Sequence, residues 1–399
     1  MADLLLKPGK ERSLLRRHPW IYDTAIARVR GAAAGDTVAV RSHDGRWLAW
    51  AAYSPTSTLR ARCWSFTETD RIDADWLAGR VREAVARREH LASTSDALRL
   101  VFGEADGLPG LIADRYAGQL VVQFQAAGVE AHREVLLDAL VAATGCANVY
   151  DRSDSAGRNR EGLEPAHGVA RGAEPPARIA IRENGRCSWV DVAGGHKTGY
   201  YIDQRDNRDL AAALVARARA PMGNIVNALN CFCYTGGFSV ALATGGGHVL
   251  SVDSSEDALA LARENWRLND LPEAAAEWLA ADVFDALRVL RSEGRAFDLI
   301  VLDPPKFAAS RHHVDRAARA YKDINLNALR LLNPGGYLLT FSCSGAIGVE
   351  LFQKIVAGAV ADAGVEAQLL RRLAAGEDHP VRISHPEGEY LKGLLLQRI

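Results

Sequence analysis

The segment from Gly223 to Ala243 most constrains how this chain can fold. Residues 225–229 are mainly apolar, residues 230–237 form a polar stretch with two glycines, and residues 238–244 return to apolar character at helical spacing. This order predicts a buried strand, a glycine turn and a helix. In an open α/β sheet, such a turn lies at the carboxyl edge of the strand, where ligands bind.

The residues after this unit indicate which ligand is expected. A second predicted strand, 248–252, ends at Asp253, 16 residues after Gly237, and a carboxylate at that place suits the two hydroxyls of a ribose. The turn has neither the GxGxxG nor the GxxxxGK[ST] spacing, which disfavours a dinucleotide or a triphosphate. We therefore expect S-adenosylmethionine, and the alternative is an ordinary glycine turn of an α/β protein.

Length and composition set the broad class. A chain of 399 residues predicts two or three domains. It contains no run of 18 apolar residues, and its six cysteines show no zinc-ligand spacing. We therefore expect a soluble, cytoplasmic protein with no membrane partner, no metal site and no disulfide framework.

Charge is unevenly distributed along the chain. The net charge is −1, but residues 1–65 hold eleven Lys/Arg and five Asp/Glu, a local +6 that leaves −7 for the rest. Basic and aromatic residues interleave in RRHPWIY, residues 16–22, which predicts that Arg17 and Trp20 contact RNA. The alternative is a solvated basic face.

The pattern of apolar residues predicts three domains. Residues 1–70 are predicted to form short strands of a small β-barrel or sandwich. Residues 71–192 are predicted to form an α+β domain. Within it, 153–178 is expected to be a loop or hairpin edge, and 179–182 is expected to pair with 189–192. Residues 193–399 alternate helix and strand, as in a parallel sheet. Its strands are expected at 224–229, 248–252, 276–280, 297–302 and 336–342, with a last pair near 365–371 and 391–398.

Two predicted strands are each followed by a candidate catalytic residue. The strand 297–302 ends in Asp303-Pro304-Pro305, where the prolines fix the backbone and hold a carboxylate at the sheet edge. The strand 336–342 is followed by Cys343 and then, after a glycine, by a helix, so the thiol is a candidate nucleophile. The alternatives are a purely structural turn and a buried, inert cysteine.

With these residues in view, the chain resembles the PUA-domain-containing bacterial 23S ribosomal RNA cytosine-C5 methyltransferases over essentially its whole length. The matching motifs are RRHPWIY, GEADGLPGL, YDRSD, GHKTGYYIDQRDNR, LNCFCYTGGFSV, VDSS, DPPKF, YKDIN, FSCSG and HPEGEYLKG. The resemblance implies an N-terminal PUA-like RNA-binding domain, a middle α+β domain and a C-terminal Rossmann-like methyltransferase domain. It further implies 23S ribosomal RNA or a large-subunit assembly intermediate as partner, and it allows a homodimer.

The resemblance also suggests roles for individual residues. Cys343 would attack C6 of the cytosine, and Asp303 would hydrogen-bond the base. The cofactor would be held by Asn230, Phe232, Tyr234, Gly236, Asp253, Ser254, Asp282 and Gln204, and the substrate by Lys306, Phe307, Tyr201, Arg17 and Trp20. Many members of the wider RNA cytosine-C5 class have, where this chain has Lys306, a second cysteine that helps to release the product, so the resemblance does not identify the group that removes the C5 proton here.

Two other functions stay open at this point. An amino-group methyltransferase acting on adenine or guanine would use Asp-Pro-Pro without covalent catalysis. A non-catalytic RNA-binding protein would keep the fold without binding the cofactor.

Overall fold

The computed structural model describes residues 2–155, 157–195, 197–219, 225–308 and 313–399. The predicted strand 224–229 and the motif GHKTGYYIDQRDNR therefore each have one residue, Asn224 and His196, outside the described residues. The chain folds into two compact units whose segments interleave. The first comprises Met1–Glu183, Val190–Ile202 and Glu377–Gly388, and the second comprises Asn184–Trp189, Asp203–Gly376 and Glu389–Ile399. The finer division into domains at residues 70 and 192 stays a prediction.

The first unit begins with a six-stranded sheet of order β2-β6-β5-β4-β1-β3. Its core is formed by small and branched side chains that alternate along the strands, such as Val38 and Val40. The elements of this part are β1 (Asp3–Leu6), α1 (Arg12–Leu15), β2 (Trp20–Ile21), β3 (Ile26–Arg30), β4 (Thr37–Arg41), β5 (Trp47–Tyr53) and β6 (Ala61–Ser65). The structure thus confirms the short strands predicted for residues 1–70.

The rest of the first unit is an α+β layer. A five-stranded sheet of order β11-β10-β9-β8-β7 packs against α2 and α4 through a leucine- and valine-rich core. Its elements are α2 (Ala74–Ala86), β7 (Ala97–Phe102), β8 (Leu111–Tyr116), β9 (Gln119–Phe124), α3 (Ala127–Ala131), α4 (Arg133–Thr144), β10 (Asn148–Ser153), α5 (Gly157–Arg160) and β11 (Ala166–Arg171). Residues 153–178, expected as a loop or hairpin edge, thus contain a strand that pairs antiparallel with β10.

A short two-stranded sheet follows, formed by β12 (Ile179–Glu183) and β13 (Arg186–Val190). Asn184 and Gly185 connect them with φ of 48° and 79°, as a tight hairpin turn requires. The predicted first strand, 179–182, is confirmed, but the prediction that the second strand spans 189–192 was wrong, because that strand begins directly after the turn.

The second unit is a seven-stranded sheet of order β16-β15-β14-β17-β18-β20-β19, in which β20 alone runs antiparallel to both its neighbours. This arrangement confirms the predicted Rossmann-like fold. Its elements are α6 (Arg205–Arg219), β14 (Val226–Cys231), α7 (Gly237–Thr244), β15 (Gly247–Asp253), α8 (Glu256–Leu268), β16 (Ala276–Ala280), α9 (Val283–Ser292), β17 (Phe297–Leu302), α10 (Val314–Leu331), β18 (Leu332–Ser342), α11 (Val349–Ala363), β19 (Ala367–Ala374) and β20 (Lys392–Arg398).

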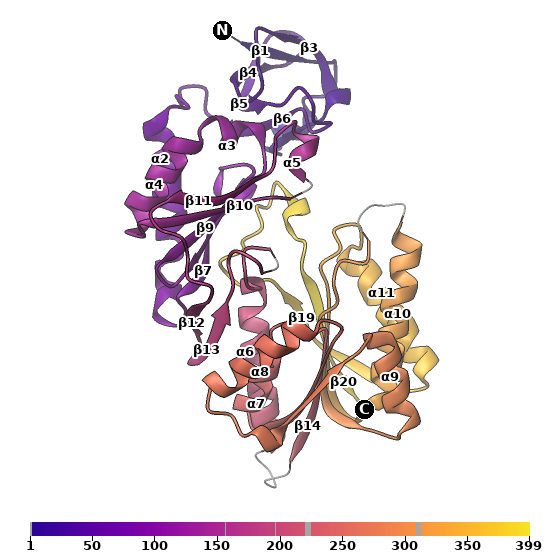
Figure 1. Ribbon diagram of the computed structural model, residues 1–399. Coiled ribbons are helices and arrows are strands. Elements are labelled where there is room, and N and C mark those ends of the chain that lie inside the picture. The colour runs from indigo at the N-terminus through magenta and orange to yellow at the C-terminus, as the bar shows by residue number, and fades with distance from the viewer. Residues whose placement is uncertain (1, 156, 196, 220–224, 309–312) are drawn as a thin grey trace. The chain divides into compact units, whose positions relative to one another are not determined.

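Helices cover both faces of this sheet (Figure 1). Successive residues of β17 point to opposite faces, so Ile300 packs with α9, α10 and α11, whereas Val301 packs with α6, α7 and α8. Burial on both faces explains why the strands read as continuous apolar runs. The strand order reverses between β14 and β17, and the loops after these two strands meet there.

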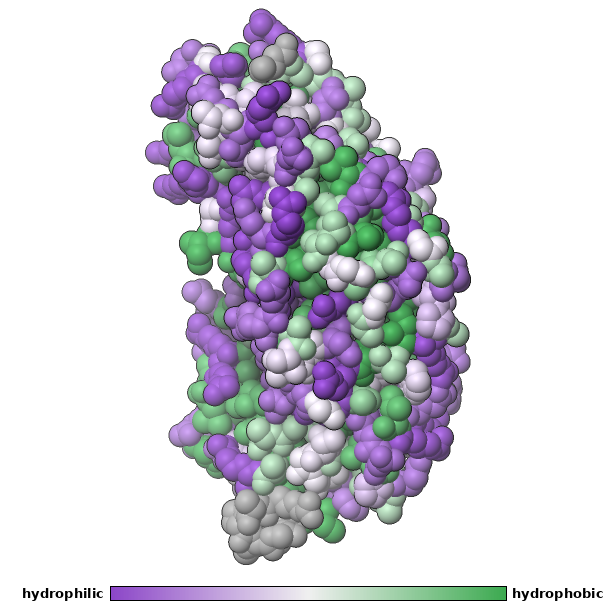
Figure 2. Space-filling view, turned by 90° about the vertical axis from the view of Figure 1, so that its left-hand side faces the viewer, coloured by the Kyte–Doolittle hydropathy of each residue, from purple (hydrophilic) through white to green (hydrophobic). Residues whose placement is uncertain are grey.

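In the described parts of the chain, no helix combines the length and the apolar character that crossing a membrane requires. Figure 2 shows hydrophilic and hydrophobic residues interspersed over one face of the molecule.

Candidate active site

The turn between β14 and α7 has an unusual backbone. Phe232, Tyr234 and Gly236 all adopt left-handed conformations, with φ of 60°, 47° and 82°. This backbone conformation is unfavourable for residues that carry a side chain, so Phe232 and Tyr234 are strained, and the surrounding structure must offset that strain. Strained backbone of this kind is typical of ligand sites. At Gly236 a Cβ would lie 3.0 Å from the Cβ of Ala262 in α8, so this glycine also permits close packing of the two helices.

Asn230, the penultimate residue of β14, is completely buried. Its Nδ2 donates to Ser239 Oγ over 2.8 Å, and Ser239 Oγ is 2.8 Å from Ser251 Oγ in β15. Asn230 Oδ1 has no hydrogen-bond partner among the described residues. A buried acceptor of this kind is costly unless something donates to it, so it fits a polar ligand at the strand end.

Asp253 ends β15, as predicted. Its carboxylate accepts hydrogen bonds from the backbone N–H of Tyr234 over 2.8 Å and of Ser255 over 3.0 Å. The first of these bonds ties the strained turn to the neighbouring strand. Each carboxylate oxygen has a second lone pair, so the group can still accept from ribose hydroxyls. Ser254 is exposed beside it.

Asp282 has a structural function of its own. Its Oδ1 caps α9 by accepting from the N–H groups of Phe284 and Asp285. The side chain is exposed and its second oxygen is not part of the cap. Contact with an adenine amino group stays a prediction for this residue.

Gln204 ends the 3₁₀ turn Ile202–Gln204 that precedes α6. The side chain is buried, and its Oε1 accepts from Asn207 Nδ2 over 2.6 Å. Its Nε2 has no partner among the described residues, so Gln204 offers a donor as Asn230 offers an acceptor. Tyr201 belongs to the first unit, where the Lys197 ammonium lies 4.3 Å from its ring centre.

Asp303 and Cys343 come from neighbouring strands. Asp303 directly follows β17 and Cys343 directly follows β18, and these strands pair in parallel with Leu302 opposite Thr340. The Cys343 thiol lies 3.9 Å from the carbonyl oxygen of Pro304, the residue after Asp303. The structure therefore brings the two predicted catalytic residues to the same edge of the sheet.

Burial separates Cys343 from most other cysteines. Cys63, Cys146, Cys231 and Cys233 are buried, whereas Cys187 and Cys343 are partly exposed. Burial raises the pKa of the Cys63 thiol to about 12 and raises those of Cys231 and Cys233 as well, so these three remain protonated. Cys343 is thus the accessible cysteine at the carboxyl edge of the parallel strands.

Sequence reasoning missed a buried polar network under Cys343. The hydroxyl of Tyr321 in α10 accepts from Ser342 Oγ over 2.9 Å and lies 3.0 Å from Ser344 Oγ, so it connects both neighbours of the cysteine. Ser344 Oγ also accepts from the N–H of Ala308. The sequence analysis named Tyr321 only as part of the motif YKDIN, because the sequence of a helix does not indicate which groups a tyrosine hydroxyl hydrogen-bonds.

The two predicted substrate residues after Asp303 differ in their surroundings. The ring of Phe307 packs against Tyr321 at 4.8 Å, Phe284 at 5.9 Å and Phe232 at 6.3 Å between ring centres. This aromatic cluster joins the loops after β14 and β17. Lys306 is exposed next to it.

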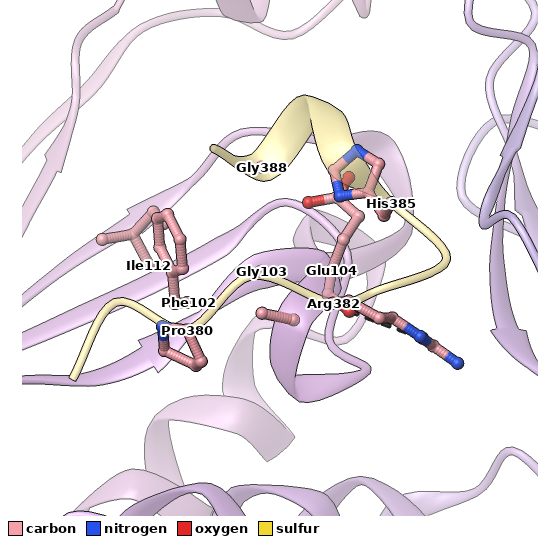
Figure 3. Close-up of a pocket in the computed structure, with 9 residues that line it drawn as sticks. Phe102, Gly103, Glu104, Ile112, Pro380, Arg382, His385 and Gly388 are labelled. Atoms are coloured by element: carbon pink, nitrogen blue, oxygen red, sulfur yellow. Dashed lines mark hydrogen bonds between the residues drawn. The ribbon is translucent and has the colours of Figure 1, made fainter. Parts of the chain in front are cut away.

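Arg17 and Trp20 lie in the first unit, where Arg17 is exposed. The indole N–H of Trp20 donates to Glu104 Oε1 over 2.8 Å, and its ring lies 4.5 Å from that of His385. Glu104 and His385 line a cavity of about 60 Å³ together with Arg382, opposite the apolar side chains of Phe102, Ile112 and Pro380 (Figure 3). The indole N–H is thus occupied within the protein, and an RNA contact by Trp20 stays a prediction.

Comparisons with known proteins agree with this geometry. Residues 4–66 match the PUA-like domain and residues 125–366 match the S-adenosylmethionine-dependent methyltransferase family. The chain is 48% identical over 394 residues to a protein of Cronobacter sakazakii named ribosomal RNA large subunit methyltransferase I, with 98% of each chain covered. A protein of the same name from Salmonella typhi is 47% identical, with 98% of this chain and 96% of that protein covered.

Two solved structures share the fold over the full length of both chains. One, described as a methyltransferase from Streptococcus mutans, gives a TM-score of 0.84, and the other, a methyltransferase complexed with SAH, gives 0.86, each at 21% identity. The site fits the cofactor of this family in three ways. It has a strained turn after β14, amide atoms that are unpaired among the described residues at Asn230 Oδ1 and Gln204 Nε2, and a carboxylate at Asp253. The chain belongs to the S-adenosylmethionine-dependent methyltransferase family, and S-adenosylmethionine is its cofactor.

Proposed function

We propose that this protein transfers a methyl group to C5 of a cytosine in large-subunit ribosomal RNA, through a covalent bond between Cys343 and C6. Relatives that match almost the whole chain are named as large-subunit ribosomal RNA methyltransferases, and a PUA-like domain at the N-terminus fits an RNA substrate. The observation that carries the choice of chemistry is that Asp303 and Cys343 follow two paired strands at one sheet edge, with the thiol 3.9 Å from the Pro304 carbonyl oxygen.

The chemistry explains why a thiol is needed. C5 of cytosine is a weak nucleophile, and addition of the Cys343 thiolate to C6 breaks the C5–C6 double bond and places electron density on C5. The Asp303 carboxyl group would accept from the exocyclic amino group of the base and, when protonated, donate to N3. Such bonds strengthen as charge develops on the ring, so they favour the transition state.

S-adenosylmethionine supplies the methyl group to C5. A base then removes the C5 proton, the electron pair re-forms the C5–C6 double bond, and the Cys343–C6 bond breaks to release the thiolate. Asn230, Gln204 and Asp253 would hold the cofactor, the first two through their amides and the third through the ribose. The target base must be unstacked to expose C6, so the substrate is single-stranded or flipped RNA.

The test is transfer of a labelled methyl group to large-subunit ribosomal RNA that lacks native modification, followed by digestion to nucleosides. We expect label in 5-methylcytidine for the wild type, none for Cys343→Ala, and wild-type activity for Cys187→Ala, the other partly exposed cysteine. Label in a methylated purine, or an active Cys343→Ala variant, would overturn the proposal in favour of amino-group methylation.

A further inference from the structure

Lys392, the first residue of β20, is an unusual lysine. Its side chain is buried, with 4% of the residue exposed. Its Nζ donates to the carbonyl oxygens of Ser344 and Ile347, each over 2.8 Å. Lysine is rarely buried unless its charge is balanced, and among the described residues no carboxylate forms an ion pair with it.

The position of Lys392 follows from the sheet. β20 pairs antiparallel with β18, and Lys392 lies opposite Ser342, the residue before Cys343. The two carbonyls that Lys392 binds belong to the turn that follows Cys343, and Ser344 O also accepts from the N–H of Ile347 over 3.0 Å. One side chain thus fixes both ends of the short turn through which the chain passes from Cys343 towards α11.

The charge of Lys392 is coupled to Cys343. Burial lowers the pKa of the lysine, and negative charge on Cys343 acts in the opposite direction. Of the other charged groups near it, Glu389 raises the pKa of Lys392 and Lys306 lowers it. Burial raises the pKa of Tyr321, and negative charge on Cys343 raises it further. A buried ammonium favours a nearby anion, so the Cys343 thiolate and the Lys392 ammonium stabilise each other.

We propose that Lys392 is the positioning residue of the nucleophile: it holds the turn after Cys343 by two hydrogen bonds and favours the thiolate by its charge. This inference rests on the proposed function of Cys343. The effect is predicted at the thiol itself, so it can be measured without RNA or cofactor.

The experiment measures the rate at which iodoacetamide alkylates Cys343 between pH 6 and pH 10, followed by mass spectrometry of the Cys343 peptide in the full chain. We expect Lys392→Met to move the midpoint to higher pH and to lower the rate at neutral pH about tenfold, since a nearby opposite charge typically shifts an acid by one pH unit or more. Lys392→Arg, which keeps the charge, should recover most of the shift. Lys354→Met removes an exposed lysine of α11 and should leave the profile unchanged.

Methyl transfer by the same variants separates the two proposals. If Cys343→Ala is inactive but Lys392→Met has the wild-type alkylation profile, the role of Lys392 is refuted and the nucleophile stands. If Cys343→Ala is active, the proposed function fails, whatever the alkylation profile shows. If Lys392→Met does not fold, Lys392→Gln, which keeps a donor but no charge, serves instead, and a profile equal to wild type in that variant likewise refutes the inference.

Discussion

Replacing Tyr321 by phenylalanine tests whether the network under Cys343 supports catalysis. The change removes one oxygen atom and keeps the ring that packs on Phe307 and Phe352. The lost hydroxyl accepts from Ser342 and lies within hydrogen-bond distance of Ser344, and all three side chains are completely buried. Water therefore cannot replace the missing partner.

The magnitude follows from these contacts. Two hydrogen bonds at about 0.5–1.5 kcal/mol each give a loss of about 1–3 kcal/mol in the free energy of unfolding. The lower part of that range applies if the serines keep their other bonds, since Ser344 Oγ still accepts from Ala308 and Ser342 Oγ from Ser344. Looser placement of the nucleophile should also lower kcat by about tenfold or more, because catalysis depends steeply on geometry.

Urea unfolding and steady-state methyl transfer measure the two effects. Tyr337→Phe is the matched control, because its hydroxyl accepts from Arg217 at an exposed site, and we expect a change within about 0.5 kcal/mol and unchanged kcat. The affinity for S-adenosylmethionine should be the same in both variants. A Tyr321→Phe protein with wild-type stability and kcat would refute the reasoning.

Three further predictions concern other parts of the structure. Asn230→Ala should weaken binding of S-adenosylhomocysteine about tenfold by calorimetry, since we propose that this buried amide binds the cofactor and such a hydrogen bond is worth about 1–2 kcal/mol; equal affinity would contradict that role. Gly236→Ala should lower stability by about 1–3 kcal/mol, because φ of 82° disfavours a side chain and the Cβ would press on Ala262; Gly294→Ala, with φ of 69° in open surroundings, should cost less, and equal losses would rule out the packing contribution. Burial lowers the pKa of His385 below its usual value of 6.5, so the unfolded chain binds this proton more readily and the free energy of unfolding falls as the pH drops below 6.5. The urea midpoint should therefore drop between pH 7.5 and pH 5.5 by less in His385→Gln than in wild type. Equal drops in the two proteins would contradict this assignment.

The sheet of the second unit could be predicted because its strands are apolar on both faces and its helices carry clear end signals. Helix α8, for example, begins after Ser255, a residue type that favours the N-cap position, and the side chain of Ser255 accepts from the N–H of Ala258. The segment 153–178 was predicted only as a loop or a hairpin edge, and β11 is the edge strand of its sheet; its half-exposed residues show neither an apolar run nor strict alternation that would have fixed its bounds. The split of the chain into interleaved units depends on contacts between distant segments, which local patterns do not contain.

The candidate site was predictable only to the level of strand ends. Asp303 and Cys343 each follow an apolar run, so their place at one edge follows from topology. Asn230, Ser342 and Lys392 lie at or next to the ends of β14, β18 and β20, where a pattern of apolar residues gives no information on what a polar side chain contacts. Burial of a polar group is unfavourable unless the group is paired, and Asn230 Oδ1 has no partner among the described residues. A fold retains buried polar groups where they do something that an apolar residue cannot. Buried polar residues at the ends of the strands of this sheet are therefore candidates for function beside Asp303 and Cys343, and Lys392 is the one whose charge the proposed chemistry at Cys343 can use.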